Sequence, residues 1–223
     1  MDAVVKVGGS LASDPAALRV LCAELAKTAE KIRFLVGPGG NEFADVVRTV
    51  DAKFGLSSQV AHRMAVLGMD QFGLLLSDLI PKARVAFSLS VVEGLSGSGR
   101  VVVLLPSRLV FRARSLPSSW DVTSDSIAAY VAGRLAAGKL VLVTDVDGVF
   151  SADPKVDARA ELIGEVSASG LSELGVRTSV DKFLPSMLLK YSLDCYVVNG
   201  RFSERVTQLL TGEKPVCTHV VAK

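Results

Sequence analysis

A lysine followed at once by a glycine-rich turn stands close to the start of the chain, where it could meet an anionic ligand. Lys6 belongs to the apolar run at residues 4–7, and Gly8, Gly9 and Ser10 come directly after that run. Backbone N–H groups in such a turn can hold phosphate oxygens, while the ammonium group offsets their negative charge. Glycine turns are also ordinary connections between elements, so this motif alone leaves both a phosphate site and a plain turn open.

Two further glycine-containing turns follow later apolar runs. The first is GPGG at residues 37–40, where Gly39 and Gly40 would let a ligand approach the main chain, and the second is DVDG at residues 145–148. Turns at neighbouring strand ends could bracket a polyphosphate. A calcium loop of the EF-hand type is disfavoured for the second turn because the other ligand positions of that loop are missing.

The elements that must position these turns follow from the hydrophobic pattern. Continuous apolar runs, rather than alternating ones, are typical of strands that helices cover on both faces. We expect strands at residues 4–7, 32–36, 83–89, 100–106, 139–144, 195–199 and 218–222, and helices at residues 16–30, 42–54, 59–79, 124–137 and 182–191. This pattern predicts the α/β class, as a three-layer α/β/α sandwich with a central, mostly parallel sheet. Since ligands of such sheets bind where strands end and helices begin, these turns are the expected ligand site.

Length, charge and cysteine usage narrow the classes of function. A chain of 223 residues with a net charge of +2 and no basic cluster predicts one domain that binds neither nucleic acid nor an anionic membrane surface. Its three cysteines are widely spaced and only two histidines accompany them, which argues against a disulfide framework and against a metal site made of protein ligands. No signal peptide and no apolar stretch of about twenty residues is evident. The sequence therefore predicts a cytoplasmic protein that acts on a small molecule.

Several familiar motifs are missing from the chain. It contains neither G-x-x-x-x-G-K-[ST] nor G-x-G-x-x-G after its first strand, which excludes a P-loop NTPase and a typical dinucleotide-binding protein. It also lacks the H-R-D and D-F-G pair of protein kinases and the G-x-S-x-G elbow of acyl transfer. The segment EGLSGSGR at residues 93–100 is expected to be a loop between two strands, either a plain solvent loop or a lid over the site.

The order of motifs along essentially the whole chain resembles that of the amino acid kinase superfamily. The matching motifs are Lys6-x-Gly8-Gly9-Ser10, GPGG at residues 37–40, Thr123-Ser124-Asp125, TDVDGVF at residues 144–150 and Asp153-Pro154-Lys155. The resemblance implies an ATP-dependent kinase that uses Mg²⁺, with an acceptor-binding and phosphate-cradle lobe at about residues 1–138 and a nucleotide-binding lobe at about residues 139–223. Phosphoryl transfer depends on in-line positioning and charge compensation more than on a general base.

The same resemblance implies a role for each matching position. Lys6 is similar to the lysine that contacts the transferred phosphoryl group. Asp125 is similar to the aspartate that organises this lysine, and it could also cap the helix that follows. Phosphate binding is implied for Gly8, Gly9, Ser10, Gly39 and Gly40. ATP binding is implied for Thr144, Asp145, Asp147, Gly148, Val149, Phe150, Asp153, Pro154 and Lys155.

The expected helix at residues 59–79 is placed where relatives bind their acceptor. His62 and Arg63 could hold an acceptor phosphate, since adjacent cationic donors suit an oxyanion. Adjacent helical positions diverge by about 100°, so a core-facing His62 beside a surface Arg63 is the alternative.

A second acceptor segment lies at residues 116–126. Together with the preceding helix and residues 178–182, it is similar to the small kinases of methanofuran biosynthesis, which phosphorylate aminomethylfuran-methyl phosphate. That similarity implies substrate contacts for Trp120, which could stack on the furan, for Asp121, which could meet the ammonium group, and for Ser124. Ordinary loop packing of Trp120 and a solvated Asp121 carboxylate remain the alternatives.

Some departures from the superfamily pattern leave roles open. Many relatives carry a second catalytic lysine where this chain has residues 177–182, so that role is not assigned to Lys182, and Val180-Asp181 is closer to uridylate kinases. Cys217 stands where relatives have a glycine. The alternatives are a uridylate kinase, another small phosphate kinase such as an isopentenyl phosphate kinase, and a catalytically silent nucleotide-binding or storage subunit. Relatives usually assemble through a helix beside the first glycine turn, so a homo-oligomer is expected. The apolar helix at residues 59–79 could form that interface, and simple core packing of this helix is the alternative.

Overall fold

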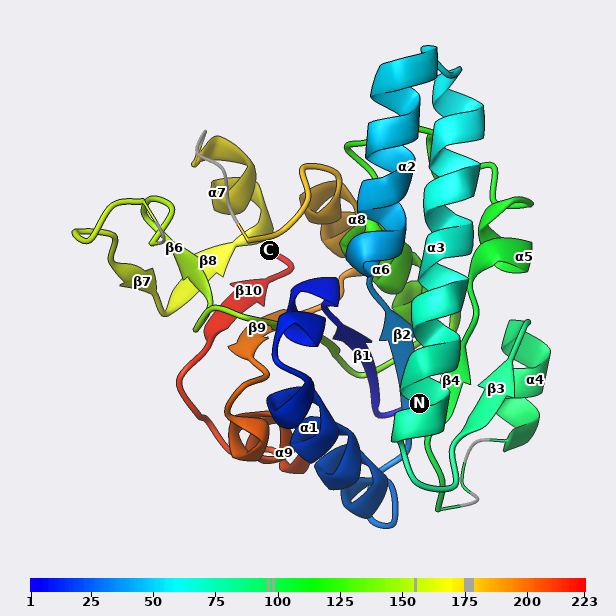
Figure 1. Ribbon diagram of the computed structural model, residues 1–223. Coiled ribbons are helices and arrows are strands. Elements are labelled where there is room, and N and C mark those ends of the chain that lie inside the picture. The colour runs from blue at the N-terminus through cyan, green and yellow to red at the C-terminus, as the bar shows by residue number, and fades with distance from the viewer. Residues whose placement is uncertain (96, 98, 155, 175–178) are drawn as a thin grey trace.

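An eight-stranded sheet forms the centre of the computed structural model, which describes residues 1–95, 97, 99–154, 156–174 and 179–223. From one edge to the other its strands are β3 (Arg84–Ala86), β4 (Val102–Leu104), β2 (Phe34–Pro38), β1 (Ala3–Val7), β5 (Leu140–Thr144), β9 (Cys195–Asn199), β10 (Thr218–Val221) and β8 (Glu165–Ser167). The first six run parallel, whereas β10 pairs antiparallel with β9 and parallel with β8. An antiparallel pair, β6 (Val149–Phe150) and β7 (Leu162–Ile163), lies near this reversed edge (Figure 1).

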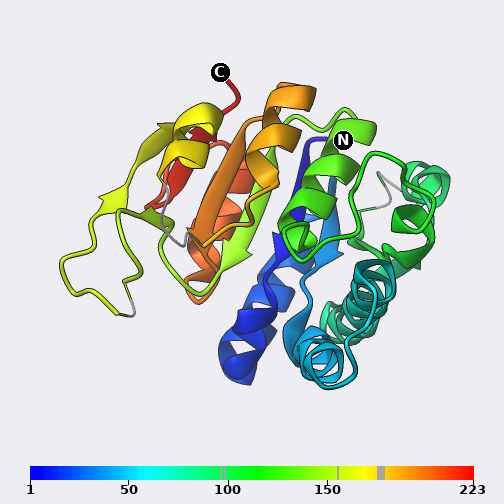
Figure 2. The same ribbon diagram turned by 90° about the horizontal axis from the view of Figure 1, so that it is seen from above.

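Helices cover both faces of the sheet and complete three layers (Figure 2). One face carries α6 (Ser124–Arg134), α7 (Ala168–Glu173) and α8 (Leu184–Tyr191), and the other carries α1 (Pro15–Thr28) and α9 (Ser203–Thr211). The long helices α2 (Asn41–Phe54) and α3 (Ser58–Leu79) pack side by side (Figure 1). The short helical elements are η1 (Gly9–Ser13), α4 (Leu89–Leu95) and α5 (Ser107–Val110).

The residues of β1 show how the sheet divides the core into two hydrophobic clusters. Val4 belongs to the cluster on the α6 face, whereas Val5 and Val7 belong to the cluster on the α1 face, because successive side chains of a strand point to opposite sides. All three valines are fully buried. The same alternation turns Lys6 toward the α6 face, where it must find a polar partner.

The fold class predicted from the sequence is confirmed, since the sheet is mostly parallel and helices cover both of its faces. The seven expected strands are present; the one at residues 195–199 matches β9 at both ends, and the other six have shifted ends. The expected strand at residues 83–89 ends at Ala86, because Ser88 begins α4 by accepting the amide of Val91 at 3.4 Å. The first part of the expected loop at residues 93–100 is therefore helical, up to residue 95. Residues 96 and 98 of that segment lie outside the described residues, so the lid hypothesis stays a prediction.

Helix ends also differ from the expected ones. α6 ends at Arg134 instead of residue 137, because Ala136 adopts a left-handed backbone with φ of 45°. α8 begins at Leu184 rather than at residue 182. Helix α9 was missed, although Val206, Leu209 and Leu210 give it a buried apolar stripe at helical spacing. Among the described helices, none is both long and apolar enough to span a membrane.

Candidate active site

The turns after β1, β2 and β5 come together because these strands are neighbours. β1 lies between the other two and runs parallel to both, with Lys6 opposite Gly37 on one side and Leu142 on the other. The carboxyl ends of the three strands therefore open at one edge of the sheet. A cavity of about 740 Å³ lies there, within the size range of small-molecule sites.

Close packing of the first two turns explains their glycines. A Cβ on Gly9 would lie 2.3 Å from the amide nitrogen of Asn41, and one on Gly39 would lie 2.5 Å from the nitrogen of Gly9. Either side chain would force the turns apart. The amides of Gly8 and Gly39 donate to backbone carbonyls of β5 and β1 at 2.7 and 2.8 Å. The amides of these two glycines thus bind the turns to the sheet, so the predicted phosphate contacts of their backbone N–H groups are not supported by this geometry.

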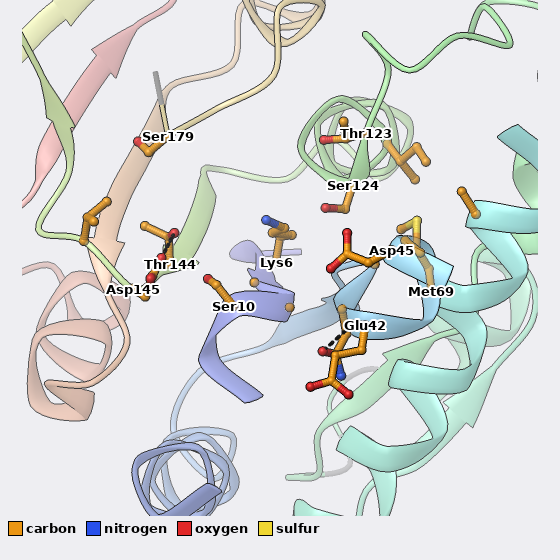
Figure 3. A pocket seen from close by; sticks show the side chains of 18 of the residues that line it. Lys6, Ser10, Glu42, Asp45, Met69, Thr123, Ser124, Thr144, Asp145 and Ser179 are labelled. Carbon is orange, nitrogen blue, oxygen red and sulfur yellow. Dashed lines mark hydrogen bonds between the residues drawn. The ribbon is translucent and has the colours of Figure 1, made fainter. Parts of the chain in front are cut away.

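Lys6 lies between two groups of cavity-lining residues (Figure 3). Thr144 and Asp145, at the end of β5, are on one side of its side chain, and Asp45 and Ser124 are on the other. The lysine therefore stands between the part of the cavity that follows β5 and the part bounded by α2 and α6. An ammonium group in this position can contact ligands bound on both sides.

An ion pair with Asp125 holds the Lys6 ammonium group in place. The Nζ atom lies 2.8 Å from Asp125 Oδ1, and the two side chains are only 12% and 8% exposed. The structure thus brings together the two residues that the family resemblance assigned to catalysis. Asp125 is not the cap of α6; the cap is Thr123, whose hydroxyl accepts the Asp125 amide at 3.5 Å.

The residues expected to bind ATP divide into two sets. Six of them line the cavity: Thr144, Asp145, Gly148, Phe150, Asp153 and Pro154. Asp147 does not, because its Oδ1 atom accepts hydrogen bonds from Arg205 Nη1 at 2.8 Å and from Asn199 Nδ2 at 2.9 Å. Val149 does not either, because it is buried in the core and its amide donates to Thr218 Oγ1 at 2.8 Å. Lys155 lies outside the described residues.

Ser179 also lines this side of the cavity, although the sequence analysis did not single it out as a site residue. Its hydroxyl donates to the carbonyl of Gly148 at 3.1 Å, which ties the segment before α8 to the turn after β5. Cys217, which replaces a glycine of the family pattern, does not line the cavity.

His62 and Arg63 point in different directions, as their helical spacing predicts. Arg63 is exposed, does not line the cavity and lies over the ring of Phe111 at 5.4 Å. His62 lines the cavity but is 5% exposed, and burial lowers its pKa, with partial compensation from a hydrogen bond to the backbone of Val122. A neutral imidazole is a poor phosphate anchor. Its Nε2 is the one buried side-chain nitrogen or oxygen in the described part of the chain without a hydrogen-bond partner.

Trp120 lines the cavity, and two residues of α2 fix its orientation. Its Nε1 donates to Asp51 Oδ2 at 2.9 Å, and the guanidinium carbon of Arg48 lies 4.3 Å from the centre of its ring system. Asp121, by contrast, does not line the cavity; its side chain is 64% exposed and lies 4.0 Å from Lys182. The expected contact between Asp121 and an acceptor ammonium group is therefore not supported by this geometry.

The sequence analysis missed the wall that α2 provides. This helix begins at Asn41, directly after the GPGG turn, and its residues at helical spacing face the cavity: Asn41, Ala44, Asp45 and Arg48. Arg48 and Lys6 are the lysine and arginine side chains among the described residues that line the cavity. The helical spacing of residues 41, 44, 45 and 48 could have predicted this wall, because a helix that starts at a ligand-binding turn must present one face to the ligand.

No group of three or more histidine, cysteine, aspartate or glutamate side chains in the described ranges could hold a metal ion. Such a group is not required for Mg²⁺, which is usually bound by one or two carboxylates, water and the substrate phosphates. Asp145 and Asp153 are carboxylates on the cavity wall that follows β5. The donor set therefore fits a magnesium ion that arrives with a nucleotide.

Comparison with known proteins places this geometry in a family. A family model described as "Amino acid kinase family" matches residues 1–188. The chain is 32% identical over 218 residues to the [5-(aminomethyl)furan-3-yl]methyl phosphate kinase of Methanocaldococcus jannaschii, covering 98% of this chain and 97% of that one. It is 25% identical over 226 residues to the molybdenum storage protein subunit beta of Azotobacter vinelandii, covering 94% and 82%.

A uridylate kinase is similar in both sequence and structure. The enzyme of Archaeoglobus fulgidus is 26% identical to this chain over 224 residues, covering 96% of this chain and 97% of that one. A crystal structure of uridylate kinase from the same organism superposes with a TM-score of 0.78 over 99% of this chain and all of that one, at 24% identity. The structural match shows that the fold is shared.

Proposed function

The chain belongs to the amino acid kinase family, and we propose that it transfers the γ-phosphoryl group of ATP to [5-(aminomethyl)furan-3-yl]methyl phosphate, giving the diphosphate in methanofuran biosynthesis. The observation that carries the proposal is the position of Lys6, paired with Asp125 and lying between two sides of one cavity. The identity of this acceptor is supported by the similarity to the Methanocaldococcus jannaschii kinase, which extends over nearly the full length of both chains.

The residues of the cavity suit the demands of phosphoryl transfer. A migrating phosphoryl group needs an in-line arrangement and compensation of its negative charge. Lys6 supplies a fixed positive charge at the centre, and the turns that contain Gly9 and Gly40 supply backbone amides beside it. Mg²⁺ held by Asp145 or Asp153 together with the phosphates would neutralise further charge. Because Asp125 fixes the ammonium group, little reorganisation is needed when the substrates bind.

The acceptor side carries groups of both signs, as a phosphate ester with an amino group requires. We assign the acceptor phosphate to Arg48, since burial lowers the pKa of His62 and so disfavours its charged form, and Arg63 does not line the cavity. Asp45 lines the cavity on the same side of Lys6 as Ser124 (Figure 3), and we assign the acceptor ammonium group to its carboxylate, in place of Asp121. Trp120 offers an aromatic wall for the furan, and the unpartnered Nε2 of His62 offers an additional hydrogen-bonding atom.

Two other functions are compatible with parts of these observations. A uridylate kinase is supported by the relative from Archaeoglobus fulgidus, and Asp45 could then accept hydrogen bonds from ribose hydroxyl groups. A silent storage subunit is suggested by the similarity to the molybdenum storage protein. The silent alternative is disfavoured by the buried ion pair of Lys6 and Asp125. Burying two charges costs desolvation free energy, and a catalytic role of the lysine would account for that cost.

An acceptor panel tests the proposal. The purified protein would be incubated with ATP and Mg²⁺ and with [5-(aminomethyl)furan-3-yl]methyl phosphate, UMP or isopentenyl phosphate, while ADP release is followed. The alcohol that lacks the phosphate group serves as the matched control. We expect the furan phosphate to give the highest kcat/KM and the alcohol to give almost no turnover. A preference for UMP would instead establish the uridylate kinase, and ATP binding without any turnover would establish the silent subunit.

We also propose that the protein works in the cytoplasm as a homo-oligomer. Val60, Leu67 and Leu74 recur at every seventh residue of α3 and are 44%, 46% and 52% exposed, so they form an apolar stripe on the outside of that helix. Val46 and Phe54 of the neighbouring helix α2 are exposed by more than 60%. Contact between such stripes of two subunits would bury them. Light scattering on the purified protein would measure the assembly state.

A further inference from the structure

The carboxylate of Asp181 accepts hydrogen bonds from six donors, three on each oxygen. Oδ2 accepts the backbone amide of Thr123 at 2.9 Å, the hydroxyl of Thr123 at 2.8 Å and the amide of Ser126 at 3.0 Å. Oδ1 accepts the amides of Phe183 at 3.1 Å and Leu184 at 2.8 Å, together with the hydroxyl of Ser126. The first oxygen therefore holds the start of α6, and the second holds the start of α8 and one further group of α6.

The two helices that meet at Asp181 come from different parts of the chain. α6 lies in the predicted acceptor-binding lobe and α8 in the predicted nucleotide-binding lobe, 50 or more residues later. The backbone amide of Asp181 donates to Asp125 Oδ2, and the other oxygen of Asp125 is paired with Lys6. Two residues earlier, Ser179 lines the cavity and is bonded to the turn after β5. A continuous chain of contacts thus runs from that turn through Asp181 to the lysine.

We infer that Asp181 is a positioning residue, which fixes the distance between Lys6 and the nucleotide side of the cavity by joining α6 to α8. This inference rests on the proposed kinase function, because a fixed distance matters only if a group moves across it. Asp181 does not line the cavity, so its carboxylate is not placed to contact a substrate. Its effect is exerted through Asp125, whose carboxylate it helps to orient.

A carboxylate with two accepting oxygens suits this role. Four of the six partners of Asp181 are backbone amides, which can only donate, and each oxygen faces two of them. Burial and the neighbouring charge of Asp125 raise the pKa of Asp181, while the hydrogen bonds from Ser126 and Thr123 oppose that rise. An asparagine has the same shape but replaces one acceptor oxygen by an NH₂ donor. In either orientation its NH₂ group would confront three donors, so the side chain would be displaced and both helix starts would lose hydrogen bonds.

The variant Asp181→Asn tests this inference. We expect kcat to fall by about 100-fold, the loss typical of a misplacement of roughly 1 Å, while the KM values for ATP and for the phosphate acceptor change by less than about threefold. Hydrogen exchange should become faster at the amides of both Ser126 and Leu184. The matched control is Asp14→Asn, the same substitution at the start of α1, where the carboxylate caps a single helix by accepting the Ala17 amide at 3.0 Å.

A second control separates positioning from general loss of stability. Leu25→Ala removes a side chain that is 2% exposed in the core on the opposite face of the sheet, so it should lower the melting temperature and leave kcat unchanged. The inference would be overturned if Asp181→Asn kept kcat within twofold of the wild type, or if only one of the two helix starts became exposed to exchange. If the wild type phosphorylated no acceptor, the proposed function would fail, and the exchange data alone would still decide whether Asp181 joins the helices.

Discussion

The centre of the cavity and its acceptor wall are built in different ways. At the centre, the Lys6 and Asp125 side chains are 12% and 8% exposed, they start from a central strand and a buried helix, and their ion pair is short. On the acceptor wall, Arg48 and Asp45 are 52% and 75% exposed, lie on one surface helix and approach each other only to 3.8 Å. The centre is held by the core of the protein, whereas the charged side chains of the wall are exposed on a helix that packs along α3.

This difference indicates where chemistry and specificity reside. A change at the centre disturbs buried charges and the packing of two glycine turns, so it costs both activity and stability. A change in α2 alters a surface that faces the ligand and leaves the sheet intact. We propose that the acceptor is recognised mainly on this wall, which would allow relatives named for a furan phosphate and for uridylate to share one fold.

The strongest test of the comparison removes the central charge. Lys6→Met should lower kcat by roughly 1000-fold, because a preorganised positive group at the migrating phosphoryl is lost. It should also destabilise the protein, since Asp125 is left buried without its partner. The double variant Lys6→Met with Asp125→Asn should recover part of the melting temperature and none of the activity. Substantial turnover by either variant, measured as ADP release, would show that the centre is not where transfer occurs.

An intermediate effect is expected from the acceptor wall. Arg48→Ala should raise the KM for the phosphate acceptor by about 10- to 100-fold, the range expected for a lost hydrogen bond to a charged group, and should leave the KM for ATP and the melting temperature nearly unchanged. Arg63→Ala is the matched control, because the same residue type on the neighbouring helix faces away from the cavity. Equal effects of the two variants would contradict the assignment of the acceptor phosphate to Arg48.

The smallest effect is expected from loss of the hydrogen bond that Trp120 donates to Asp51. Trp120→Phe keeps an aromatic ring but removes the donor to Asp51, so the acceptor KM should rise by about threefold with little change in kcat. Trp120 is the single tryptophan of the chain, and its fluorescence should therefore report acceptor binding in the wild type. An emission that does not respond to saturating acceptor would place the binding site away from this wall.

Some features of the molecule follow from local sequence and were predicted correctly. The apolar runs at residues 139–144 and 195–199 correspond closely to β5 and β9, because strands buried on both faces need continuous apolar sequence. The convergence of three turns was predictable for the same reason, since parallel strand ends meet at one edge. The assignment of catalytic roles to Lys6 and Asp125 stays a prediction, although the structure places the two side chains in contact.

Other features depend on contacts between distant segments and could not be predicted from the chain alone. Asp147 belongs to a motif of the family pattern, yet Arg205 and Asn199, more than fifty residues later, hold it away from the cavity. The inferred role of Asp181 depends on helix starts at residues 124 and 184 that only the folded sheet brings together. The exposure of Asp121 depends on how its loop is fastened by Trp120, which no local pattern encodes.

The pairing of β1 with β5 has a consequence for how the protein is made. Residues 3–7 leave the ribosome well before one of their two neighbouring strands, which begins at Leu140, more than 130 residues later. Contacts so far apart in the chain form late and slowly. The site around Lys6 can therefore form only after β5 has been synthesised. A nascent chain interrupted before residue 140 should be unable to bind the nucleotide.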